Sequence, residues 1–246
     1  MATPRFYCPA PLAAHQTIEL PAELAHHAMR VLRLKAGTPI TLFDGRGGQY
    51  PATLVTEGGK GMAETGARQD IEAELPGKLT LVQGIASGDK MDWIIEKAVE
   101  LGASRLIPVP AQRSVLLLKG PRLEKRQRHW ERVAQSASEQ CGRNRLMRID
   151  APCPLDDYLL QRDTSANRQV LCCHPGAGAS LARALRASDA HDIDLLVGPE
   201  GGWSDQELSR IDAAGVAMVQ FGPRVLRTET AGLALLAAVG ALKGWE

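Results

Sequence analysis

The second part of the chain alternates short apolar runs with amphipathic segments, and this alternation limits the fold more than any other feature. Apolar runs predict strands over 78–86, 104–109, 168–173, 192–198 and 216–222. Helical periodicity or capping signals predict helices over 90–102, 121–141, 180–188, 204–215 and 228–245. Strands that alternate with helices over such a length predict an α/β domain with a mostly parallel sheet.

The first part of the chain has a different pattern of apolar residues. Short apolar runs at 16–20, 38–44, 49–55 and 61–67 are separated by glycine-rich turns and by one helical segment at 22–34. Strands of this length and spacing predict a small β-barrel or a curled sheet. A Pro-Gly pair follows a charged stretch within residues 73–78, so we predict two domains, a β-rich one over 1–73 and an α/β one over 77–246.

Composition excludes several classes of protein. Of the 246 residues, 44% are hydrophobic and 23% charged, which is typical of a globular protein with a sizeable core. No apolar run is long enough for a membrane helix and the N-terminus does not resemble a signal peptide, so we expect a soluble cytoplasmic protein that does not bind a membrane. The five cysteines are odd in number and form no C-x-x-C pair, which favours neither disulfides nor a metal site.

Positive charge is concentrated in one segment. Residues Arg113 to Arg148 include ten Lys or Arg and three Glu, a balance of +7, which leaves −6 on the rest of a chain whose total is +1. A basic patch on an otherwise acidic protein is typical of polyanion binding. A solvated helix face explains the same pattern equally well.

Three predicted strands end in loops that contain glycine and proline. "LLVGPEGGWSDQE" (195–207) is a strand, a glycine loop and a helix start, since Ser204 and Glu207 have the spacing of a capping box. "LCCHPGAG" (171–178) and "FGPRVLRTETA" (221–231) repeat the strand-loop arrangement. Ligands of parallel sheets bind at the carboxyl ends of strands, so these loops predict one shared pocket rather than three unrelated turns. The chain lacks the dinucleotide, P-loop and G-x-S-x-G motifs, so the residues alone indicate only a small-molecule site beside a basic patch.

These motifs also carry a resemblance. "GPEGGWSDQE", "FGPRVLRTETA", "EKAVELGASRLIPV" and "SASEQCGRNR" closely resemble the bacterial 16S ribosomal RNA uracil-N3 methyltransferases, which belong to the SPOUT superfamily of knotted methyltransferases. "PRFYCP", "HAMRVLRLKAG" and "LFDGRGGQY" are similar to the small PUA-like RNA-binding domain of that family. The resemblance spans nearly the whole chain, and its motifs occur in order.

The resemblance implies a deep trefoil knot in the α/β domain, S-adenosylmethionine as cofactor, and a homodimer. It implies a uridine in the decoding region of 16S ribosomal RNA as substrate, methylated at N3 within the assembled 30S subunit. The loops matching the cofactor site contain the predicted cofactor-binding residues Leu171, Cys172, His174, Gly198, Pro199, Glu200, Gly201, Phe221, Gly222, Val225, Leu226 and Thr228.

Methyl transfer to the imide nitrogen of uracil requires loss of its proton and stabilisation of charge on the uracil oxygens. Arginine suits the second task, so Arg227 and Arg224 are the candidate catalytic residues. Glu229 is a third candidate, either as a base or as the residue that orients an arginine; a structural ion pair with Glu229 or Glu200 explains either arginine equally well. The candidate RNA-binding residues are Arg5, Arg33, Arg113, Gln140, Arg143 and Arg145.

The sequence is also compatible with two alternative functions. A ribosome-assembly or RNA-binding factor without turnover would have the basic segment but would leave the three glycine loops unexplained. A member of the same superfamily acting on transfer RNA, for example on a ribose hydroxyl, would have a similar α/β domain. Cofactor binding separates the first alternative from the enzyme, and the identity of the methylated nucleoside separates the second.

Overall fold

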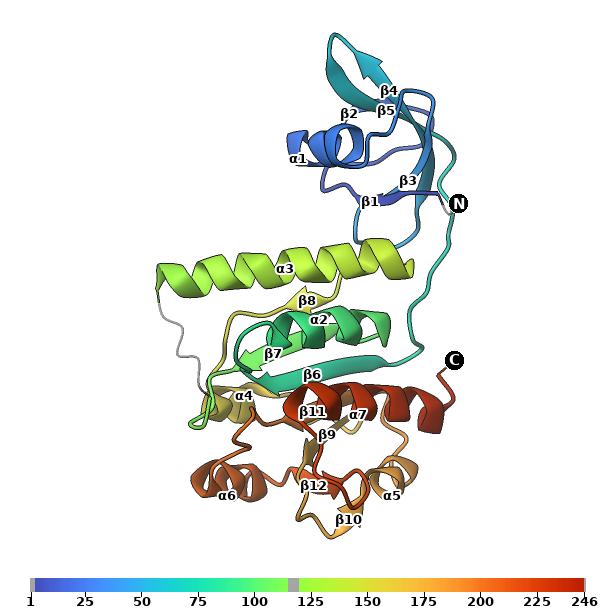
Figure 1. Cartoon of the computed structure of the whole chain (residues 1–246). Coiled ribbons are helices and arrows are strands. Elements are labelled where there is room, and N and C mark those ends of the chain that lie inside the picture. The colour runs from blue at the N-terminus through green and yellow to red at the C-terminus, as the bar shows by residue number, and fades with distance from the viewer. Residues whose placement is uncertain (1–2, 115–119, 246) are drawn as a thin grey trace. The chain divides into compact units, whose positions relative to one another are not determined.

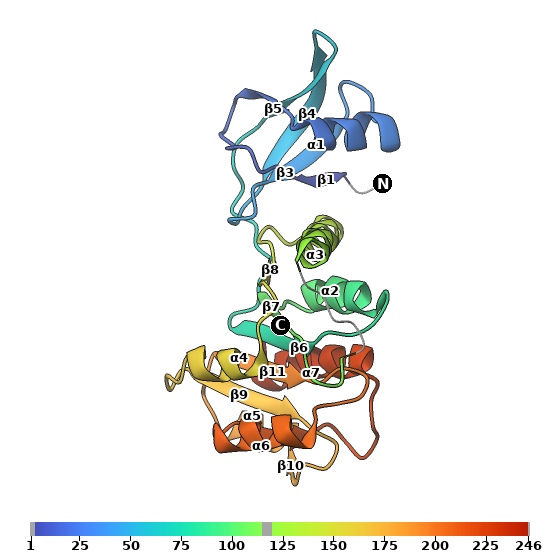
Figure 2. The same cartoon turned by 90° about the vertical axis from the view of Figure 1, so that its left-hand side faces the viewer.

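The chain forms two compact units. The computed structural model describes residues 3–114 and 120–245, so Lys119 of the basic segment lies outside the described residues. The first unit comprises Met1–Glu74 together with Ser138–Leu146, and the second comprises Leu75–Ala137 and Met147–Glu246. Figures 1 and 2 show the elements of each unit.

The first unit is built on a five-stranded sheet of order β1-β3-β4-β5-β2. Its strands are β1 (Arg5–Tyr7), β2 (Thr17–Glu19), β3 (Pro39–Phe43), β4 (Tyr50–Glu57) and β5 (Lys60–Thr65). Only the β1–β3 pair is parallel. Helix α1 (Ala22–His26) and the π-helical turn η1 (His27–Val31) bury Leu24 and Ala28 in the same core as Phe6, Ile40 and Leu54.

Within the described residues, β1 and β2 are the two edges of this sheet, so hydrogen bonds do not close it into the barrel that the sequence suggested. The segment between these strands contains Pro9 and Pro11, which have no N–H to donate to a ladder.

The segment Ser138–Leu146 belongs to the first unit, although it lies inside the range 77–246 assigned to the second domain from the sequence. Asn144 is fully buried and donates to the carbonyl of Ile71 at 2.7 Å. Arg5 donates to the Asn144 side chain at 2.7 Å and to the Gly142 carbonyl at 3.2 Å. These polar contacts hold the segment against β1 and against the residues that follow β5, and no local pattern in the sequence indicates them.

The second unit contains a seven-stranded sheet of order β10-β12-β9-β11-β6-β7-β8, in which every pair is parallel. Its strands are β6 (Lys78–Gly84), β7 (Arg105–Val109), β8 (Arg148–Ile149), β9 (Arg168–Cys173), β10 (Ala179–Ser180), β11 (Asp192–Val197) and β12 (Ala217–Gln220). The sequence therefore correctly predicted a mostly parallel α/β domain. The short strands β1, β8 and β10 were not predicted, because two or three residues show no periodicity.

Helices cover both faces of this sheet. They are α2 (Lys90–Glu100), α3 (Pro121–Cys141), α4 (Leu155–Gln161), α5 (Leu181–Arg186), α6 (Asp205–Ala213) and α7 (Thr228–Lys243). Helices α4 and α6 pack against one face, in a cluster with Val82, Cys172 and Leu196. On the other face, α7 packs against β6 and β11, and its Gly232 brings the helix close to Leu81. Helices α2 and α7 lie side by side (Figures 1 and 2). Among the described helices none is long and apolar enough to cross a membrane.

Two adjacent leucines of α4 test the importance of this packing. Leu159 is 7% exposed within the cluster, whereas Leu160 is 83% exposed. We expect Leu159→Ala to lower the free energy of unfolding by about 2–4 kcal/mol, because it leaves a cavity in a packed core. Leu160→Ala is the matched control and should change it by less than about 0.5 kcal/mol. Urea denaturation of both variants measures the difference, and equal values for the two would contradict this packing.

Candidate functional site

The three glycine loops line a single cavity in the second unit. Because all strands are parallel, their carboxyl ends lie at one edge of the sheet, and the loops that follow β9, β11 and β12 meet there. The cavity has a volume of about 490 Å³, within the range of small-molecule sites. Its walls include His174, Gly198–Trp203 and Phe221 with residues 224–229.

Close approach of the backbone requires glycine at two places beside this cavity. A side chain at Gly198 would place its Cβ 2.9 Å from the amide nitrogen of Trp203. A side chain at Gly84, at the end of β6, would place its Cβ 2.5 Å from Pro199. The chain after β11 therefore fits tightly against the end of β6, and the glycines permit a short loop at the cavity wall.

Thr228 ties the start of α7 to the loop after β11. Its hydroxyl donates to the Gly198 carbonyl at 2.6 Å and accepts from the Gln83 amide at 2.9 Å. Thr228 and Gln83 are 5% and 0% exposed, so these bonds form away from solvent. The Thr228 side chain thus positions two walls of the cavity and does not cap the helix, where no side-chain cap is present.

Glu200 links the loop after β11 to the segment after β6. Its Oε1 accepts from the Ser87 amide at 2.9 Å, the Ser87 hydroxyl at 2.6 Å and the Lys90 ammonium at 3.0 Å. Burial by itself would raise the pKa of Glu200, but the hydrogen bonds from Ser87 and Lys90 lower this pKa to about 2. Glu200 is therefore a fixed negative charge near the cavity.

The three candidate catalytic residues all lie at the cavity wall. The guanidinium groups of Arg224 and Arg227 have no hydrogen bond or ion pair with any described residue, so neither forms the structural pair with Glu229 or Glu200. Oε2 of Glu229 is shielded from solvent and likewise has no partner among the described residues. Unpaired charges of both signs beside one cavity are typical of a site that binds a polar ligand.

The predicted cofactor-binding residues divide into two groups. Those at the cavity wall are His174, Gly198, Pro199, Glu200, Gly201, Phe221, Gly222, Val225, Leu226 and Thr228. Leu171 and Cys172 are buried inside β9 at 1% and 0% exposure and do not line the cavity. Burial raises the pKa of Cys172 to about 12, so its thiol stays neutral. In the described part of the chain, no group of three His, Cys, Asp or Glu side chains is arranged to hold a metal ion.

The predicted RNA-binding residues are divided between the two units and differ in exposure. Arg143 is 3% exposed and its guanidinium pairs with Glu74 at 2.6 Å, and Arg5 is half-buried in the contacts with Asn144. Arg33, Gln140 and Arg145 are exposed on the first unit. Arg113 belongs to the second unit, where it lines the cavity and donates to the carbonyls of Gly201 and Trp203.

Sequence reasoning missed the segment that follows β6. Ser87 and Lys90 bind Glu200, and Gln83 binds Thr228. A signal was available, since "QGIASGDK" (83–90) is also a strand end followed by a glycine turn and a helix. It lacks the Gly-Pro pair that is present in the loops after β11 and β12.

Known proteins resemble both units. A family model for an RNA methyltransferase domain matches residues 73–240, and one for an RNA methyltransferase PUA domain matches residues 20–62. The chain belongs to the RNA methyltransferase family. The resemblance found in the sequence is thereby confirmed, and the protein is an enzyme that methylates RNA.

Relatives of this family cover nearly the whole chain. Proteins named ribosomal RNA small subunit methyltransferase E from Mycobacterium tuberculosis and Bacillus subtilis are 33% and 31% identical, over 89% and 91% of this chain and 85% and 89% of theirs. The crystal structure of the Neisseria gonorrhoeae protein of that name, bound to S-adenosylmethionine, is 36% identical with a TM-score of 0.89 over 98% of both chains.

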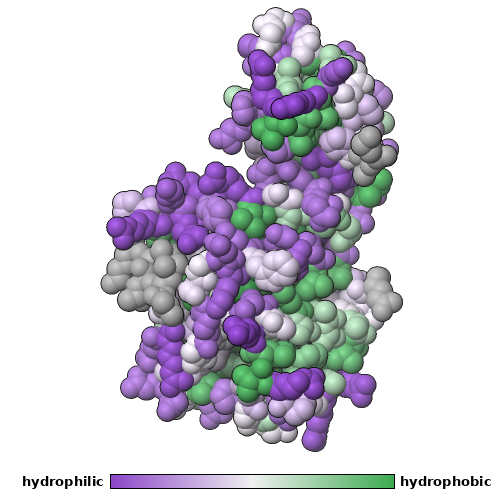
Figure 3. Space-filling model, in the orientation of Figure 1, coloured by the Kyte–Doolittle hydropathy of each residue, from purple (hydrophilic) through white to green (hydrophobic). Residues whose placement is uncertain are grey.

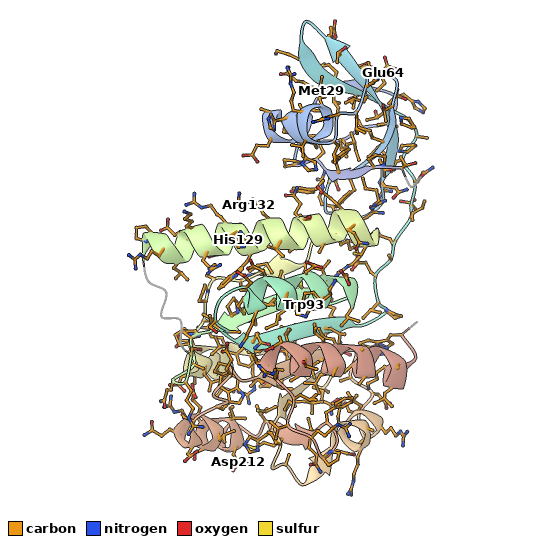
Figure 4. All side chains as sticks on the ribbon, in the orientation of Figure 1. Met29, Glu64, Trp93, His129, Arg132 and Asp212 are labelled. Atoms are coloured by element: carbon orange, nitrogen blue, oxygen red, sulfur yellow. The ribbon has the colours of Figure 1, made fainter. Side chains whose placement is uncertain are left out.

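The contacts of Glu200 predict a pH-dependent contribution to stability. Its pKa is lower in the folded chain than the ordinary 4.5, so its stabilisation is complete above about pH 4.5 and is lost as the pH falls towards 2. We expect Glu200→Gln to lower the free energy of unfolding by about 1–2 kcal/mol at pH 7, since it removes a charge-assisted hydrogen bond. The difference from the parent protein should shrink as the pH falls below 4.5. Asp212→Asn, an exposed carboxylate on α6 (Figure 4), is the control; a difference that does not change with pH would contradict the argument.

Proposed function

We propose that this enzyme transfers a methyl group from S-adenosylmethionine to N3 of a uridine in the decoding region of 16S ribosomal RNA, in the assembled 30S subunit. The observation that carries the proposal is the cavity at the carboxyl edge of the sheet, where Arg224, Arg227 and Glu229 have unpaired charged groups. The names of the relatives support ribosomal RNA of the small subunit as the substrate.

The residues of the cavity fit the methyl donor. Phe221, Val225 and Leu226 give an apolar wall against which an adenine ring would pack. The main chain of Gly198–Gly202 and the polar end of the cavity would contact the ribose and the amino-acid part. When bound, S-adenosylmethionine supplies a methyl carbon made electrophilic by the adjacent sulfonium.

The charged residues then act on the acceptor base. Glu229 has an unpaired carboxylate oxygen that can accept the N3 proton of uracil. Arg227, and with it Arg224, would donate hydrogen bonds to the uracil oxygens, where negative charge develops as the proton leaves. Because the guanidinium groups bind no described residue, they need not break an existing ion pair to do so.

RNA would contact exposed cations outside the cavity. Helix α3 has the exposed residues Arg122, Lys125, Arg128 and Arg132, and hydrophilic side chains gather along it in Figure 3. Arg33, Arg145 and Gln140 are exposed on the first unit, which matches an RNA methyltransferase PUA domain. Arg113 would act at the cavity mouth. We assign Arg5 and Arg143 the structural task of holding the segment 138–146, because their guanidinium groups already bind groups of the first unit.

We also propose that the enzyme is a cytoplasmic homodimer with a trefoil knot in the second unit. The proposed domain limits along the chain are 1–73 and 77–246, with segment 138–146 of the second domain packed in the first unit. Figure 3 shows apolar side chains gathered over α7, and Leu242 of that helix is 38% exposed, which supports a contact with a second copy.

The product of the reaction tests the proposed function. Small ribosomal subunits that lack the modification are incubated with enzyme and S-adenosylmethionine, and the digested RNA is analysed by mass spectrometry. We expect 3-methyluridine. A 2′-O-methylated nucleoside would favour the alternative within the superfamily, and the absence of both cofactor binding and product would favour an RNA-binding factor.

A variant of Arg227 tests its role in the reaction. We expect Arg227→Ala to lower kcat by about 10²–10³, the usual effect of removing one group that stabilises transition-state charge. The dissociation constant for S-adenosylmethionine and the melting temperature should stay within error. Arg186→Ala, an exposed arginine of α5, is the control. An unchanged kcat in Arg227→Ala would remove this residue from the reaction.

A further inference from the structure

We propose that a shallow recess next to the cavity, with Trp93 as one wall, holds the target uracil ring during methyl transfer. The inference rests on the proposed function and names the place of the acceptor base, which the cavity itself leaves open. The recess lies in the second unit and is lined by Ser87, Gly88, Asp89, Lys90, Trp93 and Glu229.

The recess and the cavity share two walls. Lys90 and Glu229 line both spaces, so a base in the recess would lie directly beside a methyl donor in the cavity. An acceptor must reach the methyl carbon while it is held by its own contacts, and adjacent spaces with shared side chains satisfy that requirement. The cavity wall formed by Phe221, Val225 and Leu226 is apolar and suits adenine, whereas the recess combines one aromatic ring with charged groups.

Trp93 differs from every other tryptophan of the chain. It is 52% exposed on α2 (Figure 4), whereas Trp130, Trp203 and Trp245 are at most 6% exposed. The ammonium group of Lys97 lies 5.0 Å from its ring centre, a contact that covers one face and restrains the orientation of the ring. We place the nucleobase against the opposite face, because proteins that hold unstacked bases commonly place them against an aromatic ring.

Glu229 gives the recess its selectivity for a base with an N–H donor. Its Oε2 is shielded from solvent and lacks a partner among the described residues, and a buried acceptor of this kind is stabilised when a donor arrives. Uracil has one at N3. In the reaction, N3 loses its proton to the Glu229 carboxylate and forms the new bond to the methyl carbon, while the electrons of the methyl–sulfur bond remain on sulfur. Glu229 later releases the proton to water.

Glu200 would link the two spaces. Ser87 and Lys90 are walls of the recess, and both donate to Glu200 in the glycine loop of the cavity. The bonds to Glu200 therefore hold a wall of the recess and the glycine loop of the cavity in one arrangement.

The experiment compares Trp93→Ala and Trp93→Phe with the parent enzyme, with Leu160→Ala as an exposed control on α4. Single-turnover methylation is measured against the concentration of small subunits that lack the modification. Loss of a stacking face worth about 1–3 kcal/mol corresponds to a decrease of about 5- to 150-fold in the second-order rate constant, the slope of the single-turnover rate against subunit concentration. We expect this loss in Trp93→Ala, a loss of at most about threefold in Trp93→Phe, and none in Leu160→Ala. The dissociation constant for S-adenosylmethionine should change less than twofold in all variants.

Fluorescence quenching by acrylamide gives a second measurement, because Trp93 is the only exposed tryptophan of the described residues. We expect a quenchable component in the parent enzyme that is missing in Trp93→Phe and that bound RNA substrate protects. If Trp93 is already shielded in the free enzyme, a second copy or another surface covers it and the proposal is wrong.

The remaining outcomes separate this inference from the proposed function. A normal methylation rate in Trp93→Ala would overturn the base site and leave the proposed function intact. The same holds if this variant loses affinity for S-adenosylmethionine by the same factor as it loses methylation rate. If the parent enzyme makes a methylated base other than 3-methyluridine and Trp93→Ala loses it, the recess stands and the N3 assignment is wrong.

Discussion

Parallel pairing of the strands is the constraint on which the rest of the second unit depends. It places the carboxyl ends of β6, β9, β11 and β12 at one edge, so four connections must pass through a small space. Gly84 and Gly198 allow the backbones to approach, and the buried bonds among Gln83, Thr228 and Gly198 hold them. The cavity follows from this crowding, because the loops are held by each other and leave a shaped space beside them.

The charged residues around that space fall into two groups. Those with partners support the structure, and those without partners are available for the reaction. Glu200 is satisfied by Ser87 and Lys90 and serves to join two loops. Glu229, Arg224 and Arg227 remain without partners among the described residues. An unpaired buried carboxylate oxygen costs stability, and such costs concentrate at sites where a ligand or a reaction later uses the group.

In the first unit, charged and polar residues that seemed suited to ligand binding stabilise the fold instead. The motif "EQCGRNR" is rich in cations and seemed suited to RNA, yet Asn144 and Arg143 are buried. Their contacts with Ile71, Arg5 and Glu74 complete the fold of a small unit whose sheet has only five strands. Burial of a guanidinium requires a carboxylate partner, so Glu74 and Arg143 depend on each other.

The sequence by itself determined the α/β class, the longer helices and strands, the three loops and the family, because periodicity, capping signals and contiguous motifs are local. Only the tertiary structure decided that Leu171 and Cys172 are buried away from the cavity, that segment 138–146 joins the first unit, and that Ser87 and Lys90 reach Glu200. The partners in these contacts are separated by about 70 to more than 110 residues along the chain. Which distant groups meet depends on the order of strands in a sheet, and no local pattern of side chains encodes that order.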